Sequence, residues 1–351
     1  HENEVSPLST ENATTNVADR VDQDRVWQRL MKLARIGGTE NDGVCRLALT
    51  DEEIEARRLL ITWADEIGLS VYTDDISNLF FCLEGTEADA PPVVTGSHID
   101  SQPTGGKFDG AFGVVAGFEA IQAIQESGVV PTKPIEIVVW MNEEGSRFSP
   151  GMMGSEAFTG RRPMEQILEV KDVNGIRTVE ALEKTLAMFP NIKRRSLGFP
   201  MTAFIEAHIE QGPILEELGV PVGVVTGIQG SRRFRVRVTG DEGHAGTLPM
   251  SDRKDALFSA LEMIGAMRQA FDTDQVKFTT GLFQVSPNVP SVVPSNVLFS
   301  IDIRHPDGQT LKRLGNAISG LCEENRGPCA VEVMEIATSD SLEFPNEMEF
   351  N

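Results

Sequence analysis

The sequence predicts an α/β protein in which a mainly parallel sheet carries helices on both faces and an inserted α+β sandwich follows it. In the first two thirds of the chain, short β-rich runs alternate with helical patterns, which is typical of a parallel sheet. After about Gly230 the expected order becomes strand, helix, strand, strand, helix, strand, which is typical of a small sandwich. The length of 351 residues also favours two domains, because single cores stop growing near ~250 residues.

Two helices are expected at the start of the first domain. Over residues 22–36 apolar side chains recur at helical spacing, and a pair of glycines ends the run. Thr50 and Glu53 form a capping-box pattern before a second apolar stripe, which Gly68 ends. Further along, strands are expected at 79–83, 92–96 and 135–141, and a Gly/Ala-rich helix at 110–127.

The second domain is expected to hold four strands and two helices. The strands are predicted at 233–238, 276–285, 297–304 and 330–337, and the helices at 253–270 and 309–324. The first twenty residues are polar and contain no apolar signal core, so we expect a flexible arm or a processed end there. The predicted division is an arm (1–21), a first domain (22–229), a second domain (230–340) and a return to the first domain (341–351).

The net charge argues against nucleic acid and membrane partners, and the cysteine pattern argues against disulfides and a thiolate metal site. The chain has 31 Lys and Arg against 53 Asp and Glu, a net charge of −22, and this field repels phosphate backbones and anionic lipid headgroups. Apolar stretches end well short of the ~20 residues that span a bilayer. The four cysteines form no CxxC pair, which indicates neither a disulfide framework nor a thiolate zinc site. We therefore expect a cytoplasmic protein with no nucleic acid or membrane partner.

Side chains that can bind metal ions follow the expected strands. His98 and Asp100 lie two residues apart just beyond the strand at 92–96, where open α/β sheets bind their ligands. Taken alone, this pair is more typical of a structural histidine. Asp109 changes that balance, because glycines around an acid at a helix start let the backbone fold closely around a bound group.

Two further segments supply carboxylates and a second imidazole. Glu143 and Glu144 follow the strand at 135–141. Adjacent side chains of an extended segment point to opposite sides, so one can bind a metal ion while the other faces a substrate. A solvated acidic turn is the alternative interpretation. His208 lies in an apolar setting in IEAHIEQG, and a set of His, Asp, Glu and His on strand ends suits Zn²⁺, Mn²⁺ or Co²⁺.

Five motifs extend this pattern along the chain: GSHIDSQPTGGKFDG, WMNEEGSRF, EAHIEQGP, GHAGTLPM and DIRHPD. In this order they resemble the di-metal amidohydrolases that cleave N-carbamoyl amino acids, N-carbamoyl-β-alanine (β-ureidopropionase) or allantoate, within the zinc aminopeptidase/acylase clan. The resemblance runs from about residue 22 to the end. It implies a catalytic first domain, a second domain that serves as lid and dimerisation domain, and hydrolysis of a linear ureido C–N bond to an amino acid, CO₂ and ammonia.

The resemblance also implies a role for each residue of the expected metal site. His98, Asp109 and His208 would bind one metal ion, and Asp109 would bridge to a second ion that Glu144 also binds. Glu143 would be the general base. This role agrees with its residue type, because a carboxylate beside a metal site can take a proton from an activated water.

Residues outside the metal site are implied to contact the substrate. His244 would donate to the developing oxyanion, reaching in from the partner subunit of a homodimer. Arg304 would bind the substrate carboxylate with its two-pronged guanidinium, and an ion pair with a neighbouring aspartate is the alternative. Gln211 and Arg232 also occupy substrate-contact positions of the family. Ser291 stands where the family usually has Asn, which leaves the identity of the substrate open.

The family pattern includes one more His ligand for the second metal ion, and this sequence has no His after His305. We therefore expect a weakened second metal site and low activity of this chain. Three alternatives stay open: an allantoate amidohydrolase, an N-acyl amino acid deacylase or peptidase of the same clan, and a truncated non-catalytic homologue that keeps the pocket. The QPTGG segment after His98 favours a carbamoyl substrate over allantoate.

Overall fold

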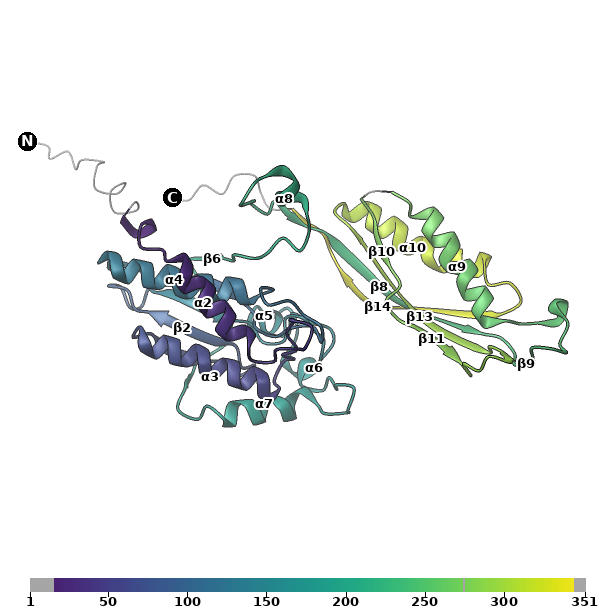
Figure 1. The fold of residues 1–351 in the computed structure, drawn as a ribbon, viewed down its shortest axis with the longest axis horizontal. Coiled ribbons are helices and arrows are strands. Elements are labelled where there is room, and N and C mark those ends of the chain that lie inside the picture. Colours follow the sequence, from purple (N-terminus) through teal and green to yellow (C-terminus); the bar gives the residue numbers. More distant parts are fainter. Residues whose placement is uncertain (1–15, 274, 344–351) are drawn as a thin grey trace, which may run out of the picture. The chain divides into compact units, whose positions relative to one another are not determined.

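The computed structural model describes residues 16–273 and 275–343. The chain separates into two compact units, residues 1–213 and 214–351, which we call unit 1 and unit 2 (Figure 1). Each unit has its own sheet and its own hydrophobic core.

The limits of these units differ from the domain limits expected from the sequence. The division precedes β8 (Gly230–Thr239), where the change of pattern was expected. The expected domain limits therefore stay a prediction. Of the arm expected over 1–21, residues 1–15 lie outside the described part of the chain. Asn16, at its described end, donates a side-chain hydrogen bond to the Ser127 carbonyl oxygen at 3.3 Å.

Unit 1 is built on a six-stranded mixed sheet in the order β5, β1, β2, β4, β3, β6. Three of its five strand pairings are parallel, and β2 is antiparallel to both neighbours, which confirms a mainly parallel sheet. Three strands of two to four residues, β1, β5 and β6, escaped prediction because they are too short to show a pattern. The bounds are β1 Ser70–Thr73, β2 Leu79–Leu83, β3 Val93–Ser97, β4 Ile135–Val139, β5 Lys193–Arg194 and β6 Ala203–Ile205.

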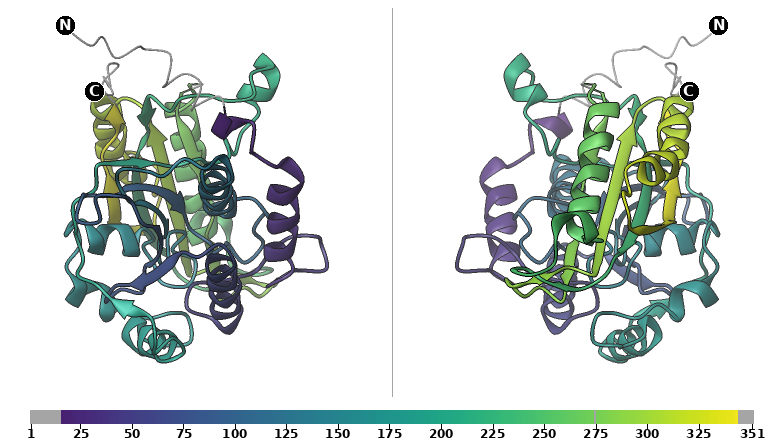
Figure 2. Two further views of the ribbon diagram at one scale, coloured as in Figure 1. Left: turned by 90° about the vertical axis from the view of Figure 1, so that its left-hand side faces the viewer. Right: turned by 90° about the vertical axis from the view of Figure 1, so that its right-hand side faces the viewer.

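Three long helices cover one face of this sheet. Leu33, Leu60 and Phe118, one from each helix, are fully buried there with Phe81 and Ile137 of the sheet. The first and third of these helices lie side by side (Figure 2). The three helices predicted from the sequence therefore contribute side chains to one hydrophobic core. The helices are α2 (Gln23–Ala34), α3 (Asp51–Glu66) and α4 (Ala111–Ser127).

The start of α3 departs in one detail from the predicted capping box. The Thr50 side chain accepts a hydrogen bond from the backbone N–H of Glu53 at 3.4 Å, as expected. The Glu53 carboxylate instead accepts from Arg57 Nε at 2.7 Å, and both side chains are buried. A buried carboxylate needs a charged partner, and this need outweighs the second bond of the box.

The opposite face of the sheet carries aromatic packing and shorter helices. Phe80 of β2 and Val138 of β4 pack there against Phe158 of α5 and against Phe199. A separate cluster around Phe148 contains side chains of α6 and α7. Helices therefore lie on more than one side of unit 1, as expected. Their bounds are α5 Met153–Phe158, α6 Met164–Leu168 and α7 Thr178–Ala187.

Unit 2 is an antiparallel sheet with two helices on one face (Figure 2). The order of its main strands is β10, β13, β8, β14, and β11 also pairs with β13. Val236 of β8, Met263 of α9 and Ile318 of α10 are fully buried in one core, which confirms the α+β arrangement. The single strand expected at 276–285 is two strands, β10 and β11, each paired with β13.

The bounds of the unit 2 elements follow the expected pattern within a few residues. The helices are α8 Ile214–Leu218, α9 Ala256–Ala270 and α10 Gly308–Glu324. The main strands are β8 Gly230–Thr239, β10 Lys277–Thr279, β11 Phe283–Ser286, β13 Asn296–His305 and β14 Ala330–Ser339. Two short ribbons are β9 Gly243–His244 with β12 Val292–Val293, and β7 Gly227–Ile228 with β15 Leu342–Glu343.

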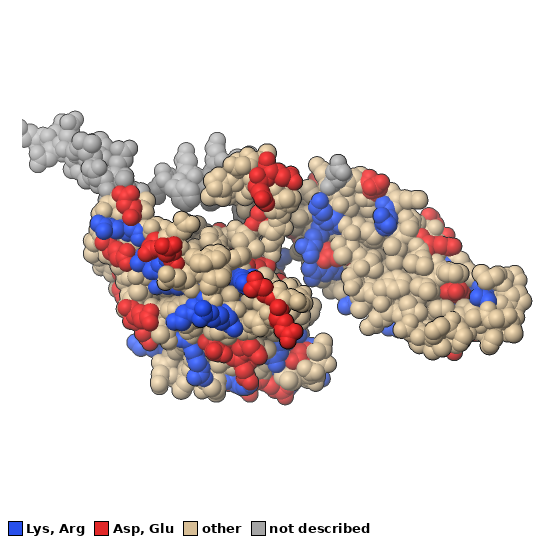
Figure 3. Space-filling model, in the orientation of Figure 1, with Lys and Arg blue, Asp and Glu red and all other residues tan. Residues whose placement is uncertain are grey.

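Acidic and basic side chains lie close together over unit 1 on the face drawn in Figure 3. Lys107 pairs with Asp42 and Lys184 pairs with Asp51, so part of the acidic excess is neutralised locally. In the part of the chain that the structure describes, no helix has both the length and the apolar composition needed to cross a bilayer.

Candidate metal centre

The strand order of unit 1 brings the expected ligands to one edge of its sheet. His98 follows β3, Glu143 and Glu144 follow β4, and His208 follows β6. These three strands run parallel, so their carboxyl ends meet at the same edge. Asp109 lies just before the glycine at the start of α4.

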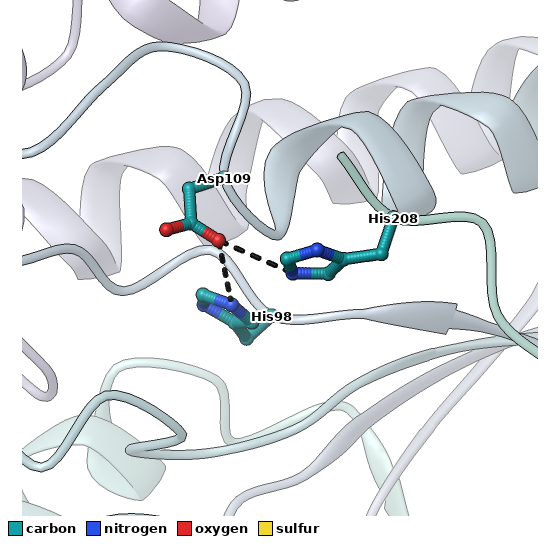
Figure 4. Close-up of side chains that lie close together, drawn as sticks. All are labelled: His98, Asp109 and His208. Atoms are coloured by element: carbon teal, nitrogen blue, oxygen red, sulfur yellow. Dashed lines mark ion pairs between the residues drawn. The ribbon is translucent and has the colours of Figure 1, made fainter. Parts of the chain in front are cut away.

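His98, Asp109 and His208 converge on one point (Figure 4). Asp109 Oδ1 lies 3.7 Å from His98 Nε2 and 3.2 Å from His208 Nε2. One ligand atom from each residue lies within 4.8 Å of the other two. Two imidazole nitrogens and one carboxylate oxygen form a donor set typical of catalytic zinc and related ions, which keep a further position open. The three side chains therefore fit one divalent metal ion.

The buried His98 ring is held in one orientation. Its Nδ1 lies 2.9 Å from the Asp100 carbonyl oxygen, which can only accept, so Nε2 stays available toward Asp109. Gly110 has a φ of +64°, and a Cβ atom there would lie 2.5 Å from the His98 ring. Glycine is therefore required where the start of α4 approaches the imidazole.

Asp100, for which the sequence predicted no role, is buried next to His98. Its carboxylate accepts hydrogen bonds from the backbone N–H groups of Glu143 at 3.2 Å and Glu144 at 3.1 Å. One of its oxygens lies 3.5 Å from His98 Nδ1, and the side chain is buried. Asp100 thus links the segment after β3 to the segment after β4. Its spacing of two residues from His98 was the available signal.

The position of Glu143 beside His98 and its raised pKa both suit a proton acceptor. Its Oε2 lies 3.4 Å from His98 Nε2. Burial raises the pKa of Glu143; the positive charge of His98 opposes the rise, and the negative charges of Asp100 and Glu144 add to it. Burial lowers the pKa of His98, but the Asp100 and Asp109 carboxylates outweigh burial and raise it well above its ordinary value. A carboxylate with a raised pKa can take up and release a proton closer to neutral pH than an ordinary glutamate.

Two glutamine amides contact the carboxylates expected at the second metal position. Gln102 Nε2 donates to Glu144 Oε2 at 2.7 Å, and Gln211 Nε2 donates to Asp109 Oδ2. Burial raises the pKa of Glu144, and the bond from Gln102 counteracts this. The structure therefore brings Gln211, expected at the substrate, next to Asp109, expected at both metal ions.

The expected residues of unit 2 lie toward two ends of its sheet. His244 in β9 pairs with β12, and the Ser291 carbonyl oxygen accepts from the backbone N–H of Ala245 at 3.0 Å, so His244 and Ser291 are neighbours. Arg304 lies near the far end of β13, eight residues beyond Asn296. Eight residues of extended strand span roughly 26 Å.

Arg232 and Arg304 point to opposite faces of the unit 2 sheet. Arg304, on the face without helices, donates to both oxygens of Asp302 at 2.9 and 3.1 Å, which is the ion pair considered as the alternative. Arg232 lies against α10, where it donates to both oxygens of Glu335 at 2.7 and 2.8 Å and to Asn316 Oδ1 at 2.9 Å. These contacts favour a packing role for Arg232 over the expected substrate contact.

The ligand set of unit 1, with the Glu143 carboxylate beside it, is typical of a metal-dependent hydrolase. The model of Peptidase family M20/M25/M40 matches residues 94–338. The solved structure of an amidase of the hydantoinase/carbamoylase family from Burkholderia vietnamiensis is 40% identical with a TM-score of 0.84, covering 94% of this chain and 80% of that one.

Two characterised relatives narrow this class. The N-carbamoyl-L-amino acid amidohydrolase of Geobacillus stearothermophilus is 41% identical over 299 residues, which cover 84% of this chain and 73% of that protein. The allantoate amidohydrolase of Bacillus subtilis is 36% identical over 296 residues, which cover 83% and 72%. The chain belongs to Peptidase family M20/M25/M40, which confirms the resemblance found in its motifs. It is a metallo-amidohydrolase of the type that acts on linear C–N bonds.

Proposed function

We propose that this protein hydrolyses the ureido C–N bond of an N-carbamoyl amino acid or of N-carbamoyl-β-alanine. The observation that carries the proposal is the convergence of His98, Asp109 and His208 with Glu143 beside them. The name of the Geobacillus relative supports the carbamoyl substrate class. Allantoate, named for the Bacillus relative, is the second candidate, because it presents a similar linear ureido group beside a carboxylate.

Two divalent metal ions, Zn²⁺, Mn²⁺ or Co²⁺, are the proposed cofactors. His98, Asp109 and His208 would hold the first ion, and Asp109 with Glu144 would hold the second. Imidazole and carboxylate ligands suit all three ions. When bound, such ions polarise the scissile carbonyl and make water acidic near neutral pH.

The residues of this chain supply the proton transfers and the orientation. Glu143 takes a proton from the attacking water as its oxygen bonds to the ureido carbon, and delivers a proton to the amino acid nitrogen as the C–N bond breaks. The released carbamate then yields CO₂ and ammonia. His244 would donate to the oxyanion, and Gln211 would contact the substrate beside Asp109. Arg304 would bind the substrate carboxylate with the guanidinium fork that Asp302 now occupies.

A homodimer in which His244 acts on the partner's substrate completes the proposal. Within one protomer, Arg304 is separated from the β9 and β12 ribbon by most of β13, roughly 26 Å of extended strand. That span exceeds the length of an N-carbamoyl amino acid. His244 and Ser291 can therefore share one substrate with Arg304 only if the two ends of the sheet come from different protomers.

We also propose a reducing compartment such as the cytoplasm. All four cysteines are free thiols; Cys82, Cys322 and Cys329 are buried, the last two in the hydrophobic core of unit 2. Burial raises the pKa of Cys82 to about 12 and that of Cys322 to about 11, which makes both thiols unreactive.

Ammonia release tests the proposed reaction. Purified protein is assayed with Mn²⁺ or Zn²⁺ on N-carbamoyl amino acids, N-carbamoyl-β-alanine, allantoate and N-acetyl amino acids, with Glu143→Gln as the inactive control. Turnover of the N-carbamoyl compounds above the others supports the proposal. Preferred turnover of allantoate supports the second candidate, and cleavage of the acetyl compounds alone indicates a deacylase. Substrate binding without turnover of any compound would indicate a non-catalytic homologue and would overturn the proposal.

A further inference from the structure

Gln102 joins two loops at the carboxyl edge of the unit 1 sheet. It lies in the loop after β3, two residues beyond Asp100. Its Nε2 donates to Glu144 Oε2 at 2.7 Å, and its Oε1 accepts from the Ser146 hydroxyl. A carboxylate oxygen can only accept, so the NH₂ group of the amide must face Glu144. Ser146, on the other side, holds the amide in this orientation.

Hydrogen bonds consequently hold both the backbone and the side chain of Glu144. Its backbone N–H donates to Asp100 Oδ2 at 3.1 Å, and its Oε2 is bound by Gln102. These contacts leave Oε1 as the oxygen available to a metal ion shared with Asp109. Partners behind a ligand commonly fix its orientation in this way, and their loss costs about 10–100-fold in metal affinity.

The neutrality of Gln102 matters as much as its position. The Asp100 carboxylate already places negative charge next to Glu144, because it accepts from the backbone N–H of that residue at 3.1 Å. An amide donor stabilises the carboxylate without adding charge, whereas an acid at this position would add repulsion. Glutamine thus supplies a donor to the Glu144 carboxylate without adding charge to this acidic site.

We propose that Gln102 is a positioning residue of the second metal site, which presents one oxygen of Glu144 to the metal ion. This inference rests on the proposed di-metal function. It predicts that Gln102 acts on the second ion selectively, because its amide makes no hydrogen bond to the first-site ligands His98 and His208 among the described residues.

Metal titration of the full chain tests this role. Metal-free protein is titrated with Mn²⁺ by calorimetry, and magnetic coupling between two bound Mn²⁺ ions is followed by electron paramagnetic resonance. Gln102→Met, which keeps the length and removes the amide, is compared with wild type and with Ser146→Ala. Gln166→Met is the matched control, since Gln166 is an exposed glutamine of α6 outside the site.

Gln102→Met should weaken the second Mn²⁺ about 10–100-fold and reduce the coupled signal, with the first Mn²⁺ within twofold of wild type. Ser146→Ala should give a smaller shift in the same direction, and Gln166→Met none. Two Mn²⁺ ions bound with wild-type constants in Gln102→Met would overturn the role of Gln102 alone. Equal weakening of both ions would also overturn it, because Gln102 would then support the whole loop. A wild-type chain that binds a single ion even at saturating Mn²⁺ would overturn the di-metal function as well.

Discussion

The functional residues expected in unit 1 lie close together, whereas those expected in unit 2 lie far apart. In unit 1, side chains from three parallel strand ends and one helix start meet at a single point. In unit 2, Arg304 lies far along β13 from the β9 and β12 ribbon that carries His244, and its fork is bound to Asp302. The residues expected in unit 1 therefore gather into one candidate metal site, whereas those expected in unit 2 are spread along its sheet.

Removing the proposed general base, Glu143, should have the largest effect on the unit 1 site. Glu143→Gln keeps the shape of the side chain but cannot accept the proton, so kcat should fall by about two to four decades. Metal content by elemental analysis should stay at the wild-type level, because Glu143 is not a proposed ligand. A variant that keeps more than a tenth of wild-type activity with metal bound would refute the assignment.

Asp100 should affect metal binding through two backbone contacts. Asn at this position retains the size but can accept only through one oxygen, so one of the N–H groups of Glu143 and Glu144 loses its acceptor. We expect Asp100→Asn to weaken metal affinity about 10–100-fold, as measured by competition with a chelator. Unchanged affinity would show that the link between the two strand ends is dispensable.

Asp74 should give unit 1 a pH dependence of stability. Its carboxylate accepts from Asn78, whose side-chain oxygen in turn accepts from the Met141 N–H at the end of β4. Burial raises the pKa of Asp74 to about 6, compared with about 3.9 for an unfolded aspartate. The protonated form is therefore favoured in the folded state, and this contribution is complete below pH ~4 and lost as the pH rises to ~6.

A shift of this size corresponds to a change of about 3 kcal/mol in the free energy of unfolding. Urea unfolding of wild type and Asp74→Asn at pH 4 and pH 6.5 would measure it. The stability advantage of wild type over the variant should shrink at the higher pH. An advantage that is equal at both values would show that Asp74 keeps an ordinary pKa.

Kinetic measurements on variants should distinguish the role of Arg304 from that of Arg232. Arg304→Lys replaces a two-pronged donor with a point charge, so KM for a carboxylate-bearing substrate should rise about tenfold with kcat little changed. Arg232→Lys should leave KM unchanged and lower stability by about 1 kcal/mol, because the Glu335 pair is weakened. A raised KM in Arg232→Lys would restore the substrate contact expected from the sequence.

The sequence singled out the side chains that converge in unit 1 because each lies beside a pattern that fixes its surroundings. The apolar strand before His98 and the glycines around Asp109 place both residues at a strand end and a helix start, where the topology brings them together. Asp100 was left without a role, since a hydrogen bond to two backbone N–H groups has no pattern in the sequence. Gln102 was missed for the same reason.

The residues of unit 2 were harder to assign from the sequence. Arg232 lies in a run of alternating residues, and the pattern alone does not show which face carries the helices. In the structure it is on the helix face, where Glu335 binds its fork. The short strands β1, β5 and β6 were missed because two to four residues carry too little periodicity, although β6 places His208.

Anomalous X-ray scattering from a Zn²⁺-loaded crystal tests the central claim most directly, because it locates the ion without reference to activity. We predict a strong peak about 2.0–2.2 Å from His98 Nε2, His208 Nε2 and an oxygen of Asp109. A Zn²⁺ peak coordinated by other residues, or full zinc content with no ion between these three side chains, would contradict the account.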